Sequence, residues 1–463
     1  MKTININFRS LFSLVVLLMA ANSCDSFVEV DQPKSQLVST IVFEDYGTAT
    51  AALTDIYSKI RDKGILTGTN TGISNQLGNY TDEIIPYGTP SNPSLNFYTN
   101  SILPSTPAIA EYWNSAYNSI YAANSVIEGT HKSNALSIEQ KNLLTGEALF
   151  IRAFLHFYLV NLYGDVPYIA QTDYRKNSTV TRDPVKTIYN NIISDLTESI
   201  AMLPASYSPT ERSRPNKLVA RALLARTYLF AGFFPEAANE ASSLLNQTPL
   251  FSLEENTADV FLIASKETIW QLQSQTSGQN TQEAEVFIFQ SGPPPLVALN
   301  NALVNSFADN DLRKSNWIKA VYDENSIWYH PYKYKEKNFT SVSKEYSIVF
   351  RLAEQYLIRA EARVQQGDLL GAKEDLNRIR HRAGLSDTYA VTKEEILEAI
   401  LNERRWEFFT EQGHRFFDLK RFNKLDQQLS SLKPGWNPTD NLLPIPQSEL
   451  STNPNLRPQN PGY

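Results

Sequence analysis

The sequence predicts a mainly α-helical protein, in which paired helices form a scaffold that carries inserted loops and a few short strands. Two observations predict this fold class. Apolar side chains recur at helical spacing through most of the chain, and proline or glycine ends many of these segments. Two regions, 64–107 and 266–340, lack that spacing and are rich in turn-forming residues.

The helical segments have recognisable ends. Ser137 precedes a long apolar run as a candidate N-cap, and Gly164 follows that run. Pro204, Pro215 and Pro249 bound later segments, since proline starts or ends a helix more readily than it continues one. The helices predicted in this half of the chain cover 43–62, 108–129, 137–165, 183–204, 215–232 and 235–249.

Two helix pairs share a pattern of small residues, in which alanine, glycine and alanine follow one another at offsets of seven and five residues. Small side chains let two antiparallel helices approach closely, and the glycine allows the turn between them. This pattern resembles the tetratricopeptide helix pair. Other segments separate the pairs, so we expect a tetratricopeptide-like scaffold with insertions. The residues are Ala225, Gly232 and Ala237, then Ala360, Gly367 and Ala372.

The two regions without helical spacing are predicted to bind the ligand. Long loops in a compact domain usually serve a function or are disordered, and interleaved aromatic residues argue against disorder here. We expect both regions to be insertions in a single domain at 43–463, which ends in a C-terminal region at 341–463. Strand-like pieces in the second insertion cover 266–273, 285–290 and 330–337, around a Ser-Gly-Pro-Pro-Pro stretch.

The N-terminus has the layout of a secretory signal, with a basic start and a short apolar run at 11–20. That run is too short to span a bilayer, which takes about 20 residues. Small residues and Cys24, the only cysteine, come next. This order resembles the bacterial lipobox, which implies removal of residues 1–23 and a lipid on Cys24. Residues 24–42 are acidic and without periodicity, which predicts a tether.

Composition excludes several kinds of site. The net charge of −7 argues against a nucleic-acid surface, which needs clustered Lys and Arg. One cysteine excludes an internal disulfide and a Cys-rich zinc site, and the five histidines form no HExxH motif. The chain has no GxSxG, Walker or GxGxxG motif, so we expect no cofactor. The oxygen-rich Asp309, Asn310, Asp311 and Glu324 lack a calcium-loop pattern, so we expect no metal.

Four stretches, in order, resemble the SusD/RagB family and span nearly the whole chain after the signal. The most specific is a Glu-Arg…Glu-Phe…Gly-x-Arg…Asp-Leu-x-Arg pattern, in which Gln412 stands where the family often has an acid. The stretches are EALFIRAFLHFYLVNLYGDVPYI (147–169), RLAEQYLIRAEARVQQGD (351–368), ILNERRWEFFTEQGHRFFDLKRF (400–422) and NLLPIPQSELSTNPNLRPQNPGY (441–463).

The resemblance implies a lipid-anchored protein of the outer membrane that faces the cell exterior. Family members lie over a SusC-like, TonB-dependent transporter and capture large nutrients for import, most often oligosaccharides or polysaccharides. RagB-like members take peptides instead. Members are binding proteins and not enzymes. The acids that follow Cys24 also resemble the surface-export signal of Bacteroidetes lipoproteins.

The charged residues at 400–422 have two interpretations. Glu403 and Glu407 stand at helical spacing and would suit the paired carboxylates of a glycoside hydrolase. Alternatively, they pair with arginines in a network that attaches the last helices to the repeats. Because arginines are numerous enough to keep every acid ionised, we favour the network and expect no general acid.

Sugar recognition needs exposed, rigid aromatic rings beside polar side chains, because a pyranose stacks its C–H face on a ring and offers hydroxyls at its rim. Trp113, Trp270 and Trp406 fit core positions instead. The other candidates lie in the two insertions, where the family resemblance implies the binding face. The predicted glycan-binding residues are Asn79, Tyr80, Asp82, Tyr87, Phe97 and Tyr98 in the first, and Trp317, Trp328 and Tyr329 in the second.

Glycan capture is therefore the leading interpretation. RagB-like peptide capture is the alternative, and would use backbone edges and fewer stacked rings. A scaffold for a protein partner would not need the lipobox and the C-terminal motifs. A glycoside hydrolase would need two unneutralised carboxylates facing a cleft, and the sequence offers no such pair.

Overall fold

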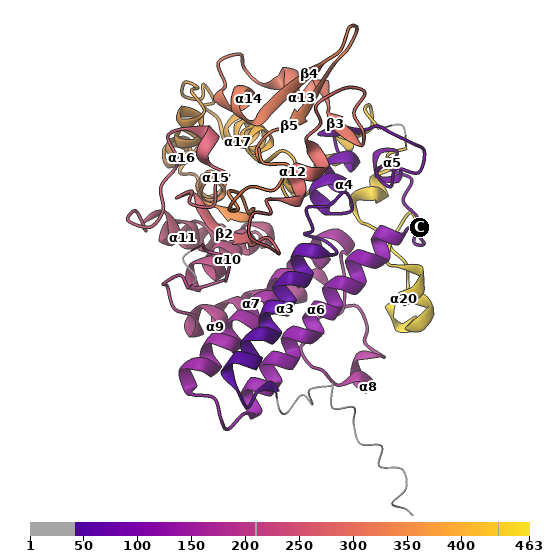
Figure 1. Cartoon of the computed structure of the whole chain (residues 1–463), viewed down its shortest axis with the longest axis vertical. Helices are drawn as coiled ribbons and strands as arrows, with labels where there is room; N and C mark the ends of the chain where they lie inside the picture. The colour runs from indigo at the N-terminus through magenta and orange to yellow at the C-terminus, as the bar shows by residue number, and fades with distance from the viewer. Residues whose placement is uncertain (1–41, 209–210, 434) are drawn as a thin grey trace, which may run out of the picture.

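The computed structural model describes residues 42–208, 211–433 and 435–463, and these residues form a mainly helical fold as predicted (Figure 1). The predicted signal, Cys24 and the tether up to residue 41 lie outside the described residues.

Four long helices form the N-terminal bundle, which fills the lower half of Figure 1. The central helix begins at a capping box on Ser137 and ends at Gly164, whose φ is 75°. Its length and hydropathy would suit a membrane span, but 89% of its most apolar window is buried in the protein, so it is the core helix. The bundle consists of α3 (Tyr46–Asp62), α6 (Pro107–Lys132), α7 (Ile138–Tyr163) and α9 (Val185–Met202).

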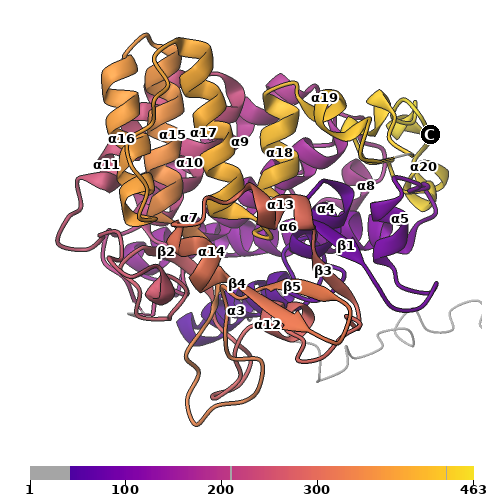
Figure 2. The ribbon, with the colours of Figure 1, turned by 90° about the horizontal axis from the view of Figure 1, so that it is seen from above.

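The two predicted helix pairs are present and lie side by side (Figure 2). Gly232 and Gly367 adopt the left-handed conformation at the two turns, with φ of 81° and 86°. The predicted alanines are fully buried between the helices, and α11 packs on α15, which confirms the tetratricopeptide-like arrangement. The helices are α10 (Lys217–Ala231), α11 (Phe234–Leu245), α15 (Leu352–Gln365) and α16 (Leu369–Arg382), extended by α17 (Lys393–Phe408).

The first insertion is more regular than its sequence predicts. It contains α4 (Ile73–Tyr80), β1 (Ile84–Pro86) and α5 (Ser94–Tyr98). All residues of α4 are buried, and its polar side chains donate hydrogen bonds to nearby backbone. Ile73, Leu77 and Tyr80 do recur at helical spacing, but the helix has only eight residues and lies among turn-forming residues, which conceal it in the sequence.

The second insertion contains short strands and helices. The prediction of a strand at 266–273 is confirmed, whereas 285–290 begins in a helix and 330–337 leaves its strand at Pro331. Thr281 caps that helix by accepting a hydrogen bond from the Ala284 amide. The elements are β2 (Thr268–Leu272), α12 (Gln282–Phe287), β3 (Val297–Leu299), α13 (Asn301–Ser306), α14 (Leu312–Trp317), β4 (Ile318–Tyr322), β5 (Ile327–Pro331) and, just beyond, β6 (Ser347–Arg351).

In the described residues, three antiparallel strand pairs lie in or next to the insertions: β1 with β3, β2 with β6, and β4 with β5. The first pair joins the two insertions directly, with Ile84 opposite Leu299 and Pro86 opposite Val297. The hairpin of β4 and β5 places Val321 opposite Trp328. Figure 2 shows β4 and β5 on the side of the molecule away from α15, α16 and α17.

The C-terminal tail runs over the end of α7. The Leu443 amide donates to the Leu162 carbonyl, and the Asn460 side chain donates to the Tyr163 carbonyl. The tail contains a short helix at Gln447–Thr452. The remaining elements are α8 (Tyr174–Asn177), η1 (Thr257–Asp259), α18 (His414–Arg421), α19 (Leu425–Leu429), η2 (Pro438–Asn441), α20 (Gln447–Thr452) and η3 (Pro454–Leu456).

Candidate functional site

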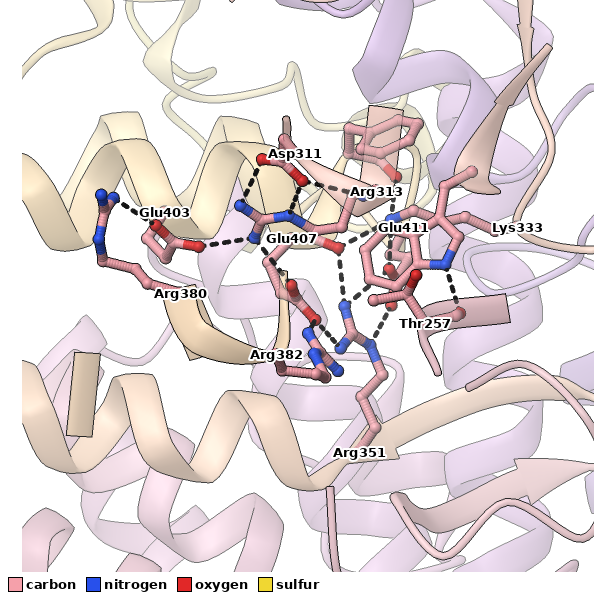
Figure 3. A network of polar contacts seen from close by, with 12 residues as sticks. Thr257, Asp311, Arg313, Lys333, Arg351, Arg380, Arg382, Glu403, Glu407 and Glu411 are labelled. Atoms are coloured by element: carbon pink, nitrogen blue, oxygen red, sulfur yellow. Dashed lines mark hydrogen bonds and ion pairs between the residues drawn. The ribbon is translucent and has the colours of Figure 1, made fainter. Parts of the chain in front are cut away.

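The charged residues at 400–422 form a buried network (Figure 3). Arg313 lies 2.6 Å from Glu403 and 3.0 Å from Glu407. Arg351 and Arg382 also pair with Glu407. Glu403 and Glu407 are fully buried, so neither carboxylate can meet a polysaccharide. The structural interpretation of this motif is confirmed.

The pKa values of Glu403 and Glu407 shift in opposite directions. Burial opposes ionisation of Glu407, but Arg382, Arg351 and Arg313 hold its pKa well below the usual value. For Glu403, burial outweighs Arg313 and Arg380, and the pKa is raised. Arginines nevertheless surround Glu403 as expected. Its two oxygens are bonded to Arg313 and Arg380, which leaves it no access to a substrate.

The network also attaches the second insertion to α17, which the sequence did not indicate. Arg313 at the start of α14 bridges Asp311 and Glu403. Lys333, just after β5, lies 2.5 Å from Glu411 and donates to the Glu407 and Phe409 carbonyls. The only signal for this link is the Asp-Leu-Arg sequence at 311–313. The insertion is therefore held rigidly on the helical scaffold.

Tyr80 and Phe97 are core residues, so their prediction as exposed stacking rings is wrong. Both side chains are 1% exposed or less. The Tyr80 ring lies 5.6 Å from Phe416 and 5.9 Å from Trp436, and its hydroxyl donates to the Asp440 carbonyl. The covering residues come from the C-terminal region, which explains why the local sequence misled the prediction.

Asn79 and Asp82 are also buried, and their prediction as sugar ligands is wrong. The Asn79 side-chain amide donates to the Asn75 carbonyl. Asp82 accepts two hydrogen bonds from Arg415, at 2.8 and 3.0 Å, and pairs with Arg405 at 2.8 Å. Burial raises the pKa of Asp82, but the two arginines prevail and lower it to about 2. Asp82 therefore attaches the first insertion to α17 and α18.

Trp317 is fully buried, which overturns its prediction as a glycan-binding residue. Its indole N–H donates to the Thr257 carbonyl at 2.7 Å. Its ring lies 5.1 Å from the Lys333 ammonium, within the apolar cluster beneath the second insertion. Its role is to support the insertion from below.

Two of the predicted rings, Tyr87 and Trp328, come together. Both are half-buried, and both pack against Phe289, Ala298 and Val321. The Tyr87 amide donates to the Leu296 carbonyl at 2.7 Å, directly after β1 pairs with β3. Trp328 is held on β5 opposite Val321. We call Tyr87, Trp328, Gly88 and residues 291–295 the Tyr87–Trp328 face.

The sequence did not indicate the glycines of this face. A Cβ on Gly292 would lie 1.9 Å from the Trp328 ring, so the indole rests directly on the Gly292 backbone. Gly88 has a φ of 89°, and a Cβ there would lie 2.8 Å from the Pro295 carbonyl. The Ser-Gly-Pro-Pro-Pro stretch was the available signal, but it did not reveal which ring it supports.

Tyr98 and Tyr329 lie apart from this pair. Tyr98 is half-buried, and the Lys433 ammonium lies 3.7 Å from the centre of its ring. Tyr329 is half-buried and packs against the cluster that contains Trp317. Tyr329 lies one residue from Trp328 on β5, and adjacent strand residues point to opposite faces.

The acids weighed as a cation site have other partners. Asp311 pairs with Arg313, and Asp309 pairs with Lys314. In the part of the chain that the structure describes, no group of three or more His, Cys, Asp or Glu side chains could hold a metal ion.

The chain matches two protein-family models and a related protein. A family model described as "Starch-binding associating with outer membrane" matches residues 43–229. A model of the SusD family matches residues 266–463. The SusD-like protein P2 of Formosa agariphila is 30% identical over 414 residues, which cover 77% of this chain and 81% of that protein.

Solved structures share the fold. A SusD superfamily protein of Bacteroides vulgatus has a TM-score of 0.79 at 23% identity, over 90% of this chain and 99% of the other. A structure named "Laminarin binding SusD-like protein" has a TM-score of 0.74 at 24% identity, over 90% of this chain and 99% of the other. With the two family models and the Formosa relative, these observations lead to one conclusion: the chain belongs to the SusD family.

Proposed function

We propose that this protein is a cell-surface lipoprotein that captures an oligosaccharide or polysaccharide and delivers it to a SusC-like, TonB-dependent transporter of the outer membrane. The observation that carries the glycan proposal is the Tyr87–Trp328 face, where two half-buried rings from two insertions pack on one apolar cluster. Each ring keeps part of its surface open to solvent and is held by β-pairing.

Such a face suits sugar recognition physically. A pyranose stacks its C–H face on an aromatic ring, and a ring that is already immobile loses little entropy when it binds. Two rings would support a Kd of ~10 μM to 1 mM, or roughly 4–7 kcal/mol, which is a useful range for a protein that must release its ligand to a transporter.

Family membership also supports the proposal. One matching family model carries the description of starch binding and outer-membrane association, and one similar structure is named for laminarin binding. The lipobox and the family resemblance support the proposed lipid on Cys24, and the family resemblance supports the proposed exterior orientation and transporter partner. Because Glu403 and Glu407 are buried, we further propose that the protein binds its ligand without cleaving it.

Purified residues 25–463 provide the test. Affinity electrophoresis against laminarin, starch and a panel of other polysaccharides should show retardation by at least one, with no reducing ends released. Retardation by none of them, together with binding to peptides, would favour the RagB-like alternative. Release of products with turnover would contradict a binding-only protein.

A further inference from the structure

A large cleft lies away from the Tyr87–Trp328 face. It has a volume of about 990 Å³ and opens between the end of α7, the start of α9, the α18–α19 region and the C-terminal tail. Figure 2 shows α18 and α19 next to this tail. A cleft of this size can enclose a ligand of several sugar units.

The cleft is cationic, although the protein as a whole is acidic. Four cationic side chains and two carboxylates line it, whereas the net charge of the chain is −7. The carboxylates are Asp165 and Asp426, which accept hydrogen bonds from the Val185 amide and the Trp436 indole. The cations are Arg182, Lys420, Arg421 and Arg457.

Two of these cations are held only by neutral oxygens. The Lys420 ammonium donates to the Asn161 carbonyl at 2.7 Å. Arg182 donates to the carbonyls of Asp165 and Pro458 and to the Asn460 side chain. Among residues 42–208, 211–433 and 435–463, no carboxylate forms an ion pair with either cation. Burial alone lowers the pKa of Lys420 to about 7, so the ammonium and the neutral amine coexist near neutral pH, and a bound anion would favour the ammonium.

The third cation, Arg457, is exposed on the tail, and the fourth, Arg421, is neutralised by Glu361 and Asp418.

The rest of the lining suits a sugar. Asn423 and Asn441 are exposed and offer amides to hydroxyl groups, and the half-buried Phe230 offers apolar surface.

We propose that this cleft is a second binding site, which takes an acidic saccharide and holds its carboxylate or sulfate with Lys420 and Arg457. An anion there supplies the partner that Lys420 lacks, and charge-assisted hydrogen bonds are stronger than neutral ones. This site is separate from the Tyr87–Trp328 face and does not depend on it.

Isothermal titration of residues 25–463 with trigalacturonate, a sulfated galactan trisaccharide, maltotriose and triglutamate tests this site, in 150 mM salt to screen non-specific attraction. We expect trigalacturonate or the sulfated sugar to bind more tightly than maltotriose and triglutamate, and the stronger of the two identifies the anion. Lys420→Met should weaken that binding about tenfold. Arg457→Ala, on the exposed tail, should weaken it too, and keeps the test valid if Lys420→Met does not fold.

Two control variants distinguish this cleft from general charge attraction and from the Tyr87–Trp328 face. Lys393→Met removes one exposed charge at the start of α17, and Tyr87→Ala with Trp328→Ala removes the two rings of that face. Both should leave the affinity for the acidic sugar unchanged. The proposal is wrong if neither anionic sugar binds below ~5 mM, if both Lys420→Met and Arg457→Ala leave the affinity unchanged, or if triglutamate binds as tightly as the sugars.

Discussion

Tyr87 and Trp328 pack against one apolar cluster of Phe289, Ala298 and Val321, although two insertions far apart in the sequence supply the two rings. Pairing of β1 with β3 places Tyr87 beside the second insertion, and pairing of β4 with β5 places Trp328 there. Ion pairs of Arg313 and Lys333 with α17 then hold the second insertion on the scaffold. The strand pairing and the buried ion pairs together hold the two rings rigidly.

A methyl group at Gly292 should disturb this pair. In Gly292→Ala, the new Cβ would lie 1.9 Å from the Trp328 ring, so the indole must move. We expect about tenfold weaker polysaccharide binding, because a stacking contact is worth roughly 1 kcal/mol and its loss is accompanied by disorder of the ring. Affinity electrophoresis measures this. Gly47→Ala is the control, since its Cβ approaches only Asp45, at 3.0 Å. Unchanged binding by Gly292→Ala would exclude Trp328 from the site.

Asp82→Asn should weaken the fold rather than the ligand contact. It leaves Arg415 and Arg405 buried without their carboxylate, and loss of one partner of a buried ion pair costs about 3 kcal/mol or more. Urea unfolding at pH 7 measures the loss. Asp55→Asn, in an exposed pair with Lys59, should cost less than ~1 kcal/mol. A stable Asp82→Asn protein that no longer binds glycan would restore Asp82 as a ligand contact.

The same ion pair predicts a response to acid. The folded pKa of Asp82, about 2, lies below its ordinary value of 3.8. Its contribution to the free energy of unfolding is therefore present above pH 4 and is lost as the pH falls toward 2. It amounts to roughly 2 kcal/mol. The stability difference between wild type and Asp82→Asn should shrink over this interval, and a difference that stays constant would contradict the assignment.

The pKa of Glu83 predicts the opposite change of stability with pH. Burial, and then the charge of Asp82, raise the pKa of Glu83 to about 7, from an ordinary value of 4.5. Between these values the folded protein holds a proton that the unfolded chain has released, so stability falls as the pH rises through this range. Glu83→Gln should therefore raise the melting temperature more at pH 8 than at pH 5. An equal rise of the melting temperature at both pH values would contradict this. Glu236 is exposed, so Glu236→Gln should leave the melting temperature unchanged at pH 5 and at pH 8.

The lipid attachment can be tested separately. Cys24→Ala should give a folded protein that binds glycan but leaves the membrane fraction, because no acyl chain remains to anchor it. Labelling with an alkyne fatty acid and fractionation of cells measure this. Lipid labelling of Cys24→Ala would show that another residue is the attachment site.

The scaffold was predictable because its signals are local. Ser137 and Gly164 bound α7, and Gly232 and Gly367 make the turns of the two helix pairs, as their positions in the sequence indicate. α4 was not predicted, since it has only eight residues and lies among Gly, Asn and Thr residues that indicate a loop.

The site was only partly predictable, because burial depends on segments that are distant in sequence. Tyr80 and Tyr87 lie in the same insertion and look alike in the sequence. Phe416 and Trp436 cover Tyr80, whereas the β1–β3 pairing leaves Tyr87 half-exposed beside Trp328. Local sequence therefore identifies candidate rings, and only tertiary contacts decide which of them can meet a ligand.

The most direct test of glycan capture is the affinity of Tyr87→Ala with Trp328→Ala for the polysaccharide that the wild type binds. Tyr389→Ala, which removes a 90% exposed ring between α16 and α17, is the matched control. We predict at least about a tenfold loss of affinity for the double variant, no loss for the control, and melting temperatures within a few degrees of wild type for both. Wild-type affinity in a folded double variant would contradict the account.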